Sequence, residues 1–233
     1  MTGLLYRWPH AGRFGRVVPK TKFYEHGQVS TSVRDKFVAE VQRIVWAYKL
    51  AESTINLAGT TEVPEIQVFR IDAKHDDVSE AVLNAIDKAV KTPIIFEISR
   101  CVEGLRQART VAAHKELGSR IPKLGTYYTG DWQPADADRH APPTAIDLAA
   151  LHTALLEPLI PLAARPGEGL SGMTARLERT RKVEREIAAL ERRIRSEPQL
   201  NRKVELRRTL KAKRDELANL TSPNPTPTSD TKD

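Results

Sequence analysis

A strand, a helix and a second strand within residues 65–99 constrain the fold of this chain more than any other feature. The first strand, EIQVFRIDAK at 65–74, alternates, and its faces consist of Phe69, Ile71 and Ala73 on one side and of Ile66, Val68, Arg70, Asp72 and Lys74 on the other. The second face is therefore apolar at its start and polar at its end. Residues 78–90 have helical apolar spacing, and PIIFEIS at 93–99 is an apolar strand. This order predicts a right-handed crossover between two parallel strands.

Further segments extend this unit into an α+β domain, in which helices pack a small mixed β-sheet. Residues 35–50 carry apolar side chains three and four positions apart, which predicts an amphipathic helix. Two more strands are expected within residues 105–114 and 127–132, followed by a linker over 134–144 and a helix over 146–159.

The C-terminal part predicts an α-helical hairpin that resembles a coiled coil. Two apolar seams in different registers consist of Val183, Ile187, Leu190 and Ile194, and of Leu206, Leu210, Leu217 and Leu220. Pro198 lies between the seams and would cost a continuous helix about 3 kcal/mol. We therefore expect one helix over 173–195, a turn at SEPQ and a second helix that ends near residue 220.

The predicted organisation has four parts. They are a basic, aromatic, turn-rich segment (1–34), an α/β core domain (35–165), a basic helical hairpin (171–220) and a disordered tail rich in Pro, Thr and Ser (221–233). Before the hairpin, PGEGLSG matches G-x-G-x-x-G, but the dinucleotide-binding fingerprint requires a strand immediately before it. Because a proline-interrupted helical segment precedes this motif, we interpret it as a hinge.

The net charge of +7 is confined to the hairpin. Residues 171–220 contain fifteen Lys and Arg against eight Asp and Glu, so the remainder of the chain is neutral. Such a local excess favours an acidic partner, DNA or RNA, whereas the alternative is a solvated helix face. Without a base-reading motif, the binding is expected to be sequence-tolerant. The candidate cations are Arg176, Arg179, Arg181, Arg185, Arg192, Arg193, Arg195, Arg202, Lys203, Arg207 and Arg208.

The N-terminal segment also interleaves cations with aromatic residues. The candidate cations are Arg13, Arg16, Lys20 and Lys22, and the aromatic residues are Tyr6, Trp8, Phe14, Phe23 and Tyr24. In one interpretation the aromatic rings stack on bases while the cations contact phosphates. In the alternative, the rings cover the hydrophobic core.

The pattern Asp72-x-Lys74 is half of the motif with which many metal-dependent nucleases hold a cation and the scissile phosphate. Both side chains are expected on one face of a strand, and Glu97 on the second strand is the plausible further acid. The alternative is a strand end with ordinary solvated charges. The single Cys101 and the scattered histidines predict neither a metal site nor a cofactor, and the constellation is too incomplete to predict an enzyme.

Several stretches together resemble a known family. They are VVPKTKFYE, WAYKL followed after three residues by TINL, EIQVF, PIIFE and QLNRKVELRR. From about Leu4 to Leu220 the chain is similar to the uncharacterised bacterial family known as domain of unknown function 4391. The resemblance implies no established activity or catalytic residues. It implies a setting, because such proteins resemble small accessory components encoded beside helicases and DNA methyltransferases of restriction-type defence systems.

We therefore expect a non-catalytic accessory protein. Its partner is either nucleic acid itself or a helicase or methyltransferase that acts on nucleic acid. One alternative is a metal-dependent nuclease that uses Asp72, Lys74 and Glu97. The other is a structural adaptor whose hairpin pairs with another protein or forms a homo-oligomer. The N-terminus lacks the apolar core of a signal peptide, and no stretch is apolar enough to span a bilayer, so we expect a cytoplasmic protein without a membrane partner.

Overall fold

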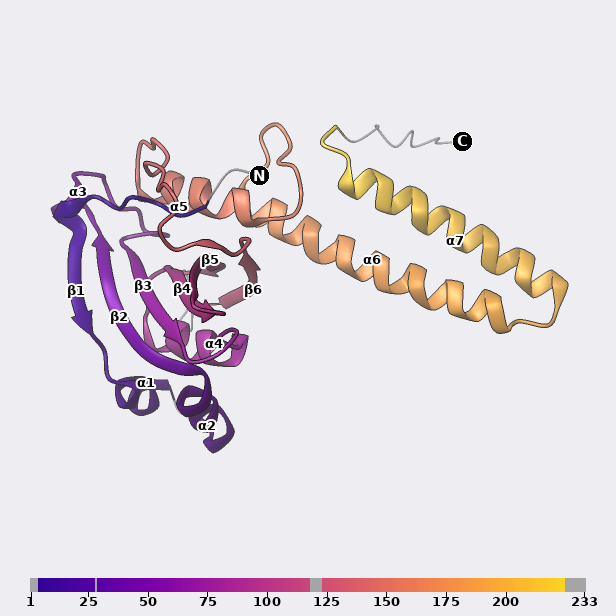
Figure 1. The fold of residues 1–233 in the computed structure, drawn as a ribbon. Coiled ribbons are helices and arrows are strands. Elements are labelled where there is room, and N and C mark those ends of the chain that lie inside the picture. Colours follow the sequence, from indigo (N-terminus) through magenta and orange to yellow (C-terminus); the bar gives the residue numbers. More distant parts are fainter. Residues whose placement is uncertain (1–3, 28, 118–122, 225–233) are drawn as a thin grey trace. The chain divides into compact units, whose positions relative to one another are not determined.

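The computed structural model describes residues 4–27, 29–117 and 123–224, and the chain forms two compact units (Figure 1). The first unit, Met1–Leu159, is an α+β domain, and the second unit, Ile160–Asp233, contains the helical hairpin. The helical elements are η1 (His10–Gly12), α1 (Lys20–Gly27), α2 (Thr31–Glu40), α3 (Glu52–Ile55), α4 (Glu80–Ala89), α5 (Leu148–Leu156), η2 (Glu157–Leu159), α6 (Leu170–Ser196) and α7 (Leu200–Thr221).

A mixed β-sheet forms the centre of the first unit. Its strands are β1 (Arg13–Val17), β2 (Val41–Leu50), β3 (Ile66–Ala73), β4 (Ile94–Val102), β5 (Leu105–Glu116), β6 (Lys123–Thr129) and β7 (Gln133–Pro134). The strands β1 to β6 lie side by side in chain order, and β7 pairs with β5. All pairs are antiparallel except β3 and β4, which are parallel and connected through α4. The predicted parallel crossover and the α+β fold class are confirmed.

The predicted helix over residues 35–50 is wrong beyond Glu40. There α2 ends, and Val41–Leu50 form β2, which pairs with both β1 and β3. The buried positions of this strand are Val41, Ile44, Ala47 and Leu50. They recur every third residue, as on a helix.

Two irregularities in β2 explain this misleading spacing. Its pairing with β3 shifts register between Val41 and Arg43 and again between Trp46 and Tyr48. A β-bulge places an extra residue in one strand, so the alternation of inward and outward side chains is interrupted. Two such shifts within ten residues turn a period of two into an apparent period of three.

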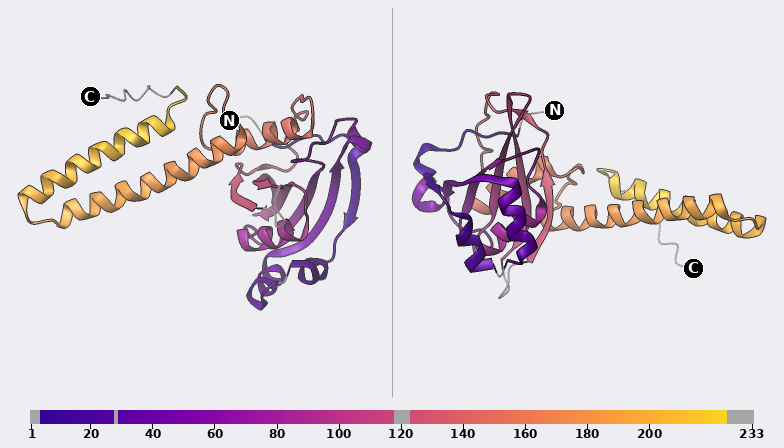
Figure 2. Two further views of the ribbon diagram at one scale, coloured as in Figure 1. Left: turned by 180° about the vertical axis from the view of Figure 1, so that it is seen from behind. Right: turned by 60° about the horizontal axis from the view of Figure 1, so that its bottom comes forward.

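The main hydrophobic core lies between one face of the sheet and the helices α1, α2 and α4 (Figure 2). Phe69 and Ile71 of β3 belong to it, together with Phe37 of α2 and Ile86 of α4. At the C-terminal end of α4, the buried Lys115 Nζ donates to the carbonyl oxygens of Asp87, Val90 and Thr92 and forms an ion pair with the Asp87 carboxylate at 2.7 Å. The lysine thus satisfies carbonyl groups that the helix end leaves without intrahelical partners.

The opposite face of the sheet is covered only at one end among the described residues. There Val68, Ile95 and Ala112 are fully buried, α5 lies against β5, and Thr110 Oγ1 donates to the Leu4 carbonyl at 2.6 Å. Of the N-terminal aromatic residues, Tyr6, Trp8 and Phe23 are buried, as expected if the rings cover the core. Phe14 remains partly exposed and packs against Trp46, with the two rings tilted by 41°.

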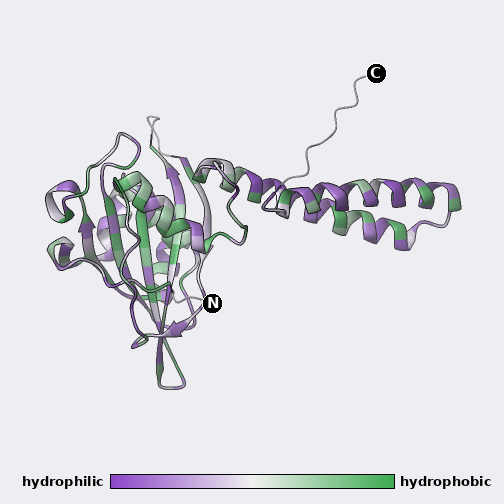
Figure 3. Cartoon of the chain, turned by 90° about the horizontal axis from the view of Figure 1, so that it is seen from above, coloured by the Kyte–Doolittle hydropathy of each residue, from purple (hydrophilic) through white to green (hydrophobic). Residues whose placement is uncertain are grey.

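The second unit confirms the predicted hairpin. Here α6 and α7 run antiparallel side by side, and Glu197–Gln199 form the turn between them (Figures 1 and 2). Gly167, with a φ of 75°, lies in a turn rather than after a strand, so PGEGLSG lacks the context of a dinucleotide site. Hydrophilic residues predominate along α6 and α7 (Figure 3). In the described part of the chain, no helix combines the length and apolar character needed to cross a membrane.

Candidate anion-binding site

Four arginines and two carboxylates meet on the open face of the sheet, opposite α1, α2 and α4. Strand register places most of them in two adjacent rows across β2, β3, β4 and β5. The inner row consists of Val45, Arg70, Glu97 and Thr110, and the outer row consists of Arg43, Asp72, Ser99 and Ala108. Because residues of a row are direct cross-strand partners, their side chains point to the same side of the sheet.

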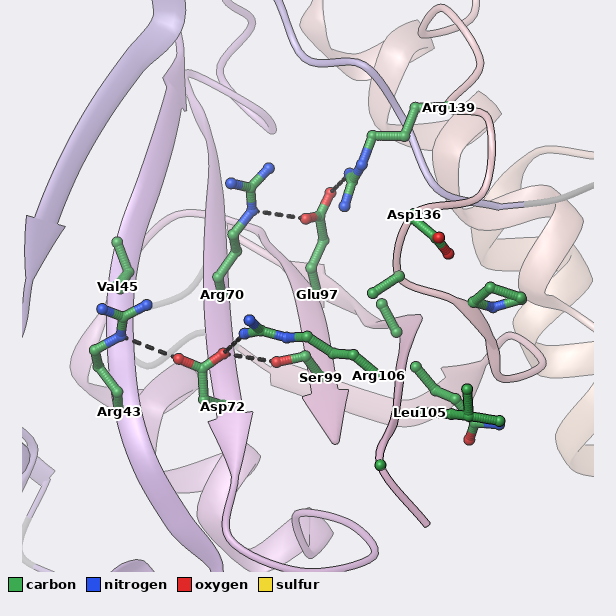
Figure 4. A pocket seen from close by; sticks show the side chains of 15 residues that line it. Arg43, Val45, Arg70, Asp72, Glu97, Ser99, Leu105, Arg106, Asp136 and Arg139 are labelled. Atoms are coloured by element: carbon green, nitrogen blue, oxygen red, sulfur yellow. Dashed lines mark hydrogen bonds and ion pairs between the residues drawn. The ribbon is translucent and has the colours of Figure 1, made fainter. Parts of the chain in front are cut away.

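Asp72 organises the outer row (Figure 4). Its Oδ2 accepts a hydrogen bond from Arg43 Nε at 3.0 Å, and its Oδ1 accepts from Arg106 Nη2 at 2.9 Å and from Ser99 Oγ at 2.6 Å. Arg106 comes from β5, beyond the row itself. Both oxygens of Asp72 are therefore engaged, and the carboxylate fixes two guanidinium groups at the rim of the pocket.

Glu97 organises the inner row in the same way. Its Oε2 accepts from Arg70 Nε at 2.8 Å, and its Oε1 accepts from Arg139 Nη1 at 2.9 Å and from Trp8 Nε1 at 2.6 Å. The Glu97 side chain is 4% exposed, so its negative charge requires these cationic partners. Burial lowers the pKa of Arg70, but the neighbouring Glu97 carboxylate raises it by more. The pKa of Arg70 therefore lies above its usual value.

The two rows border a pocket of about 690 Å³. Its charged lining consists of Arg43, Arg70, Arg106, Arg139, Asp72, Glu97 and Asp136, so cations exceed anions by one. Apolar wall comes from Val45, Leu105, Ala108 and Pro134. Arg43 and Arg70 contact their carboxylates through Nε, and Figure 4 shows the two η nitrogens of each at the far end from that contact. A guanidinium held in this way can offer its planar donor fork to a phosphate.

The comparison with protein families agrees with the resemblance seen in the sequence. The family model described as Domain of unknown function (DUF4391) matches residues 7–217. The chain belongs to this family. No curated protein and no solved structure matches it.

The three residues predicted for a nuclease do not all lie in the pocket of this DUF4391 member. Asp72 and Glu97 both line the pocket, as adjacent parallel strands allow. Lys74 does not line it, because Lys74 Nζ donates to the Val38 carbonyl of α2 at 2.7 Å. Within the described residues, no three His, Cys, Asp or Glu side chains gather as metal ligands would.

The hairpin cations fall into two groups. Arg176 is buried, pairs with Glu168 at 2.6 Å and donates to the Leu220 and Ala163 carbonyls, so it holds the base of the hairpin together. Arg179 is exposed and pairs with Glu216 at 2.8 Å. The described chain places no carboxylate at ion-pair distance from the others, which are Arg181, Arg185, Arg192, Arg193, Arg195, Arg202, Lys203, Arg207 and Arg208.

The N-terminal cations are also divided. Arg13 borders a hollow beside the pocket, together with Arg43 and Arg70. Arg16 lies over the Phe14 ring at 4.8 Å. Lys20 Nζ donates to the Val41 carbonyl, and Lys22 pairs with Glu25 on the surface. Of these four residues, Arg13 is thus the one that borders the pocket region.

Sequence reasoning missed the four pocket arginines as a group. Arg43 was hidden because β2 was predicted as a helix, and Arg139 because its segment was interpreted as a linker. The polar end of the 65–74 strand was the available signal, since it identified Arg70 and Asp72 as neighbours on a wet face. Arg106 had no comparable signal, because its place beside Asp72 depends on the pairing of β4 with β5.

Proposed function

We propose that this protein is a non-catalytic accessory protein that binds DNA or RNA through phosphates, without reading the base sequence. The observation that carries the proposal is the pocket in which Asp72 and Glu97 each hold two arginines. Arginine forks match phosphate oxygens in geometry and charge, and guanidiniums already fixed by a carboxylate lose less conformational entropy on binding.

The occupied carboxylates favour an anion over a cation as ligand. Each of the four oxygens of Asp72 and Glu97 accepts a hydrogen bond from an arginine at 2.8 to 3.0 Å. Asp72 Oδ1 also accepts from Ser99, and Glu97 Oε1 also accepts from Trp8. A divalent cation at either carboxylate would have to displace guanidiniums and stand beside them. A phosphate would instead be attracted by them.

The hairpin supplies a second basic surface for the same class of ligand. Most of the described cations without ion pairs lie in the half that contains the turn, where Arg192, Arg193 and Arg195 of α6 precede Arg202 and Lys203 of α7. These residues are mainly exposed and would contribute phosphate contacts that add to salt-dependent affinity.

The partner enzyme remains part of the proposal. The restriction-type setting implied by the family resemblance supports a helicase or methyltransferase that works on the same nucleic acid. In that arrangement the protein would hold the strand while the enzyme supplies the chemistry.

One observation favours the adaptor function as a second candidate. None of the residues of α7, all of which are described, is buried, and Leu200 and Val204 are 71% and 44% exposed. An apolar seam that one hairpin leaves half-covered can pair with another helix, including that of a second copy of the chain.

The test is binding of the full chain to short fluorescent DNA and RNA strands, measured by anisotropy over a range of salt. We expect nanomolar to micromolar affinity that falls with salt, and Arg43→Gln/Arg106→Gln to lower the affinity and reduce the salt slope by about one, because both guanidiniums contact the same phosphate. The matched control is Lys36→Gln/Lys91→Gln, which removes two exposed charges elsewhere in the first unit. Absence of binding at low salt, or equal losses in both variants, would contradict the proposal.

A further inference from the structure

The arginines of the pocket differ in exposure, from an outer pair to a more buried inner pair. This difference indicates which part of a nucleic acid the pocket binds. We infer that it binds the end of a single strand, with a terminal phosphomonoester between Arg70 and Arg139 and the next backbone phosphate at Arg43 and Arg106. This inference rests on the proposed function and adds the ligand class of the site.

Exposure decreases from the outer to the inner arginine pair. The Arg43 and Arg106 side chains are 57% and 64% exposed, whereas those of Arg70 and Arg139 are 42% and 25% exposed. An incoming strand therefore meets the outer pair first. The inner pair is closer to the buried Glu97, in a place where electrostatic attraction is screened less by water.

The pocket ends behind the inner row. The next row along the β-strands is Tyr48, Val68, Ile95 and Ala112. Val68, Ile95 and Ala112 are fully buried, and the half-buried Tyr48 ring lies under the Arg70 guanidinium at 5.4 Å. Trp8, which donates to Glu97, is buried as well, and Tyr6 forms a β-bridge with His140 beside it. A nucleic-acid strand that enters over the outer row and runs along β3 meets this buried row just beyond Arg70 and Arg139. The group that reaches these two arginines is therefore the end of the nucleic-acid strand.

The spacing of the two rows suits consecutive phosphates. Arg70 and Asp72 are two residues apart on β3, which corresponds to about 6.6 Å along the strand. Successive phosphates of an extended single strand have a similar separation. A duplex end would have to bring its second strand into the same pocket of about 690 Å³.

Charge favours a terminal phosphate over an internal one. A phosphomonoester carries a charge of about −1.5 to −2 at pH 7, because its second pKa is about 6. An internal phosphodiester carries one negative charge. Arg70, Arg139 and the Glu97 carboxylate together carry a net charge of +1. Because Coulomb attraction scales with the product of the charges, this net charge attracts the terminal group more strongly than an internal phosphodiester. The apolar wall, with Leu105 at 69% exposure, can contact sugar and base without reading the sequence.

The experiment compares three single-stranded oligonucleotides of one sequence, which carry a 5′-phosphate, a 3′-phosphate or hydroxyls at both ends. Anisotropy with the full chain should show a preference of roughly tenfold for one phosphorylated end, equivalent to about 1.4 kcal/mol. The preferred end gives the polarity of the strand in the pocket. The preference should fade below about pH 6, as the terminal phosphate takes up a proton.

Variants assign the preference to the inner pair. Arg139→Gln combined with Glu97→Gln removes a guanidinium without leaving the buried carboxylate underpaired, and it should abolish the preference while weak binding persists. Arg43→Gln/Arg106→Gln should weaken all three ligands and keep the preference. If the Arg139→Gln/Glu97→Gln variant fails to fold, Arg139→Lys provides the same comparison, because it keeps the charge but loses the donor fork.

The outcomes separate this inference from the proposed function. Equal affinity for all three strands would overturn end recognition and leave phosphate-backbone binding intact. A preference that is unchanged in both the Arg139→Lys and the Arg139→Gln/Glu97→Gln variants would also overturn end recognition. No binding of any strand at low salt would overturn both.

Discussion

Asp72 accepts a hydrogen bond from Arg43 Nε at 3.0 Å, across the β2–β3 pair. The carboxylate that the Asp72-x-Lys74 pattern would assign to a metal cation thus engages a guanidinium. Arg106 and Ser99 use its other oxygen. This relationship makes Asp72 a residue that positions arginines.

Replacement of Asp72 by Asn tests whether Asp72 acts by positioning Arg43 and Arg106 or only through its effect on the net charge of the pocket. Removal of an acid raises the positive charge of the pocket, so an account based on charge alone predicts tighter binding of oligonucleotides. We expect roughly three- to tenfold weaker binding, about 1 kcal/mol, because Arg43 and Arg106 lose a charged partner that holds them. Asp35→Asn on α2 makes the same charge change outside the pocket and serves as the control in the anisotropy measurement.

The same variant tests the nuclease alternative. We expect no cleavage of DNA or RNA by the wild-type chain with Mg²⁺ or Mn²⁺, followed on a denaturing gel. Metal-dependent cleavage that disappears in the Asp72→Asn protein would show that the pocket is catalytic.

Arg176 is expected to stabilise the hairpin without binding ligand. Together with Arg165 it donates to the Leu220 carbonyl at the C-terminal end of α7, and it pairs with the partly buried Glu168. Arg176→Met should lower the free energy of unfolding by about 2–4 kcal/mol, because it leaves buried acceptors unpaired. Chemical denaturation followed by circular dichroism measures this loss. A fully stable variant with impaired oligonucleotide binding would instead make Arg176 a ligand contact.

The exposed arginines near the hairpin turn should behave in the opposite way. Arg192→Gln, Arg193→Gln and Arg195→Gln combined should reduce the salt slope of nucleic-acid binding by up to about three and leave the helical content unchanged. Salt titrations and far-ultraviolet circular dichroism provide the two readouts. An unchanged slope would remove the hairpin from the binding surface.

Stability should fall with acid because of His152. This side chain is buried in α5, and in the described structure its Nε2 has no hydrogen-bond partner. Burial, with the nearby positive charges of His114 and Lys115, lowers the pKa of His152 from 6.5 to about 3. Because the unfolded chain binds this proton below about pH 6.5 and the folded chain does not, stability is lost as the pH falls towards 3, by up to about 1.4 kcal/mol per unit.

His152→Leu should remove this part of the pH dependence. The measurement is the difference in unfolding free energy between wild type and variant at pH 7 and pH 5. Parallel curves for the two proteins would show that His152 is protonated without cost in the folded state.

The sequence was sufficient to predict those helices and strands in which apolar residues recur with a regular period. The β3–α4–β4 crossover and the α6–α7 hairpin follow from their patterns and from Pro198, whereas β2 was missed because its register shifts disguise the alternation. Asp72 and Glu97 could be brought together because parallel neighbours were predicted. The arginine pairs could not, since they depend on β2–β3 and β4–β5 register and on a segment, Ala135–Arg139, without regular structure.

The most direct test of the pocket is the Nε–Hε nuclear magnetic resonance spectrum of the arginines during titration with a single-stranded oligonucleotide. Arg→Lys variants assign the signals of Arg43 and Arg70. Both signals should shift in a saturable, salt-sensitive manner, because their guanidiniums contact phosphate while Nε stays bound to Asp72 or Glu97. Signals of Arg43 and Arg70 that remain unchanged while the protein is saturated with oligonucleotide would contradict the account.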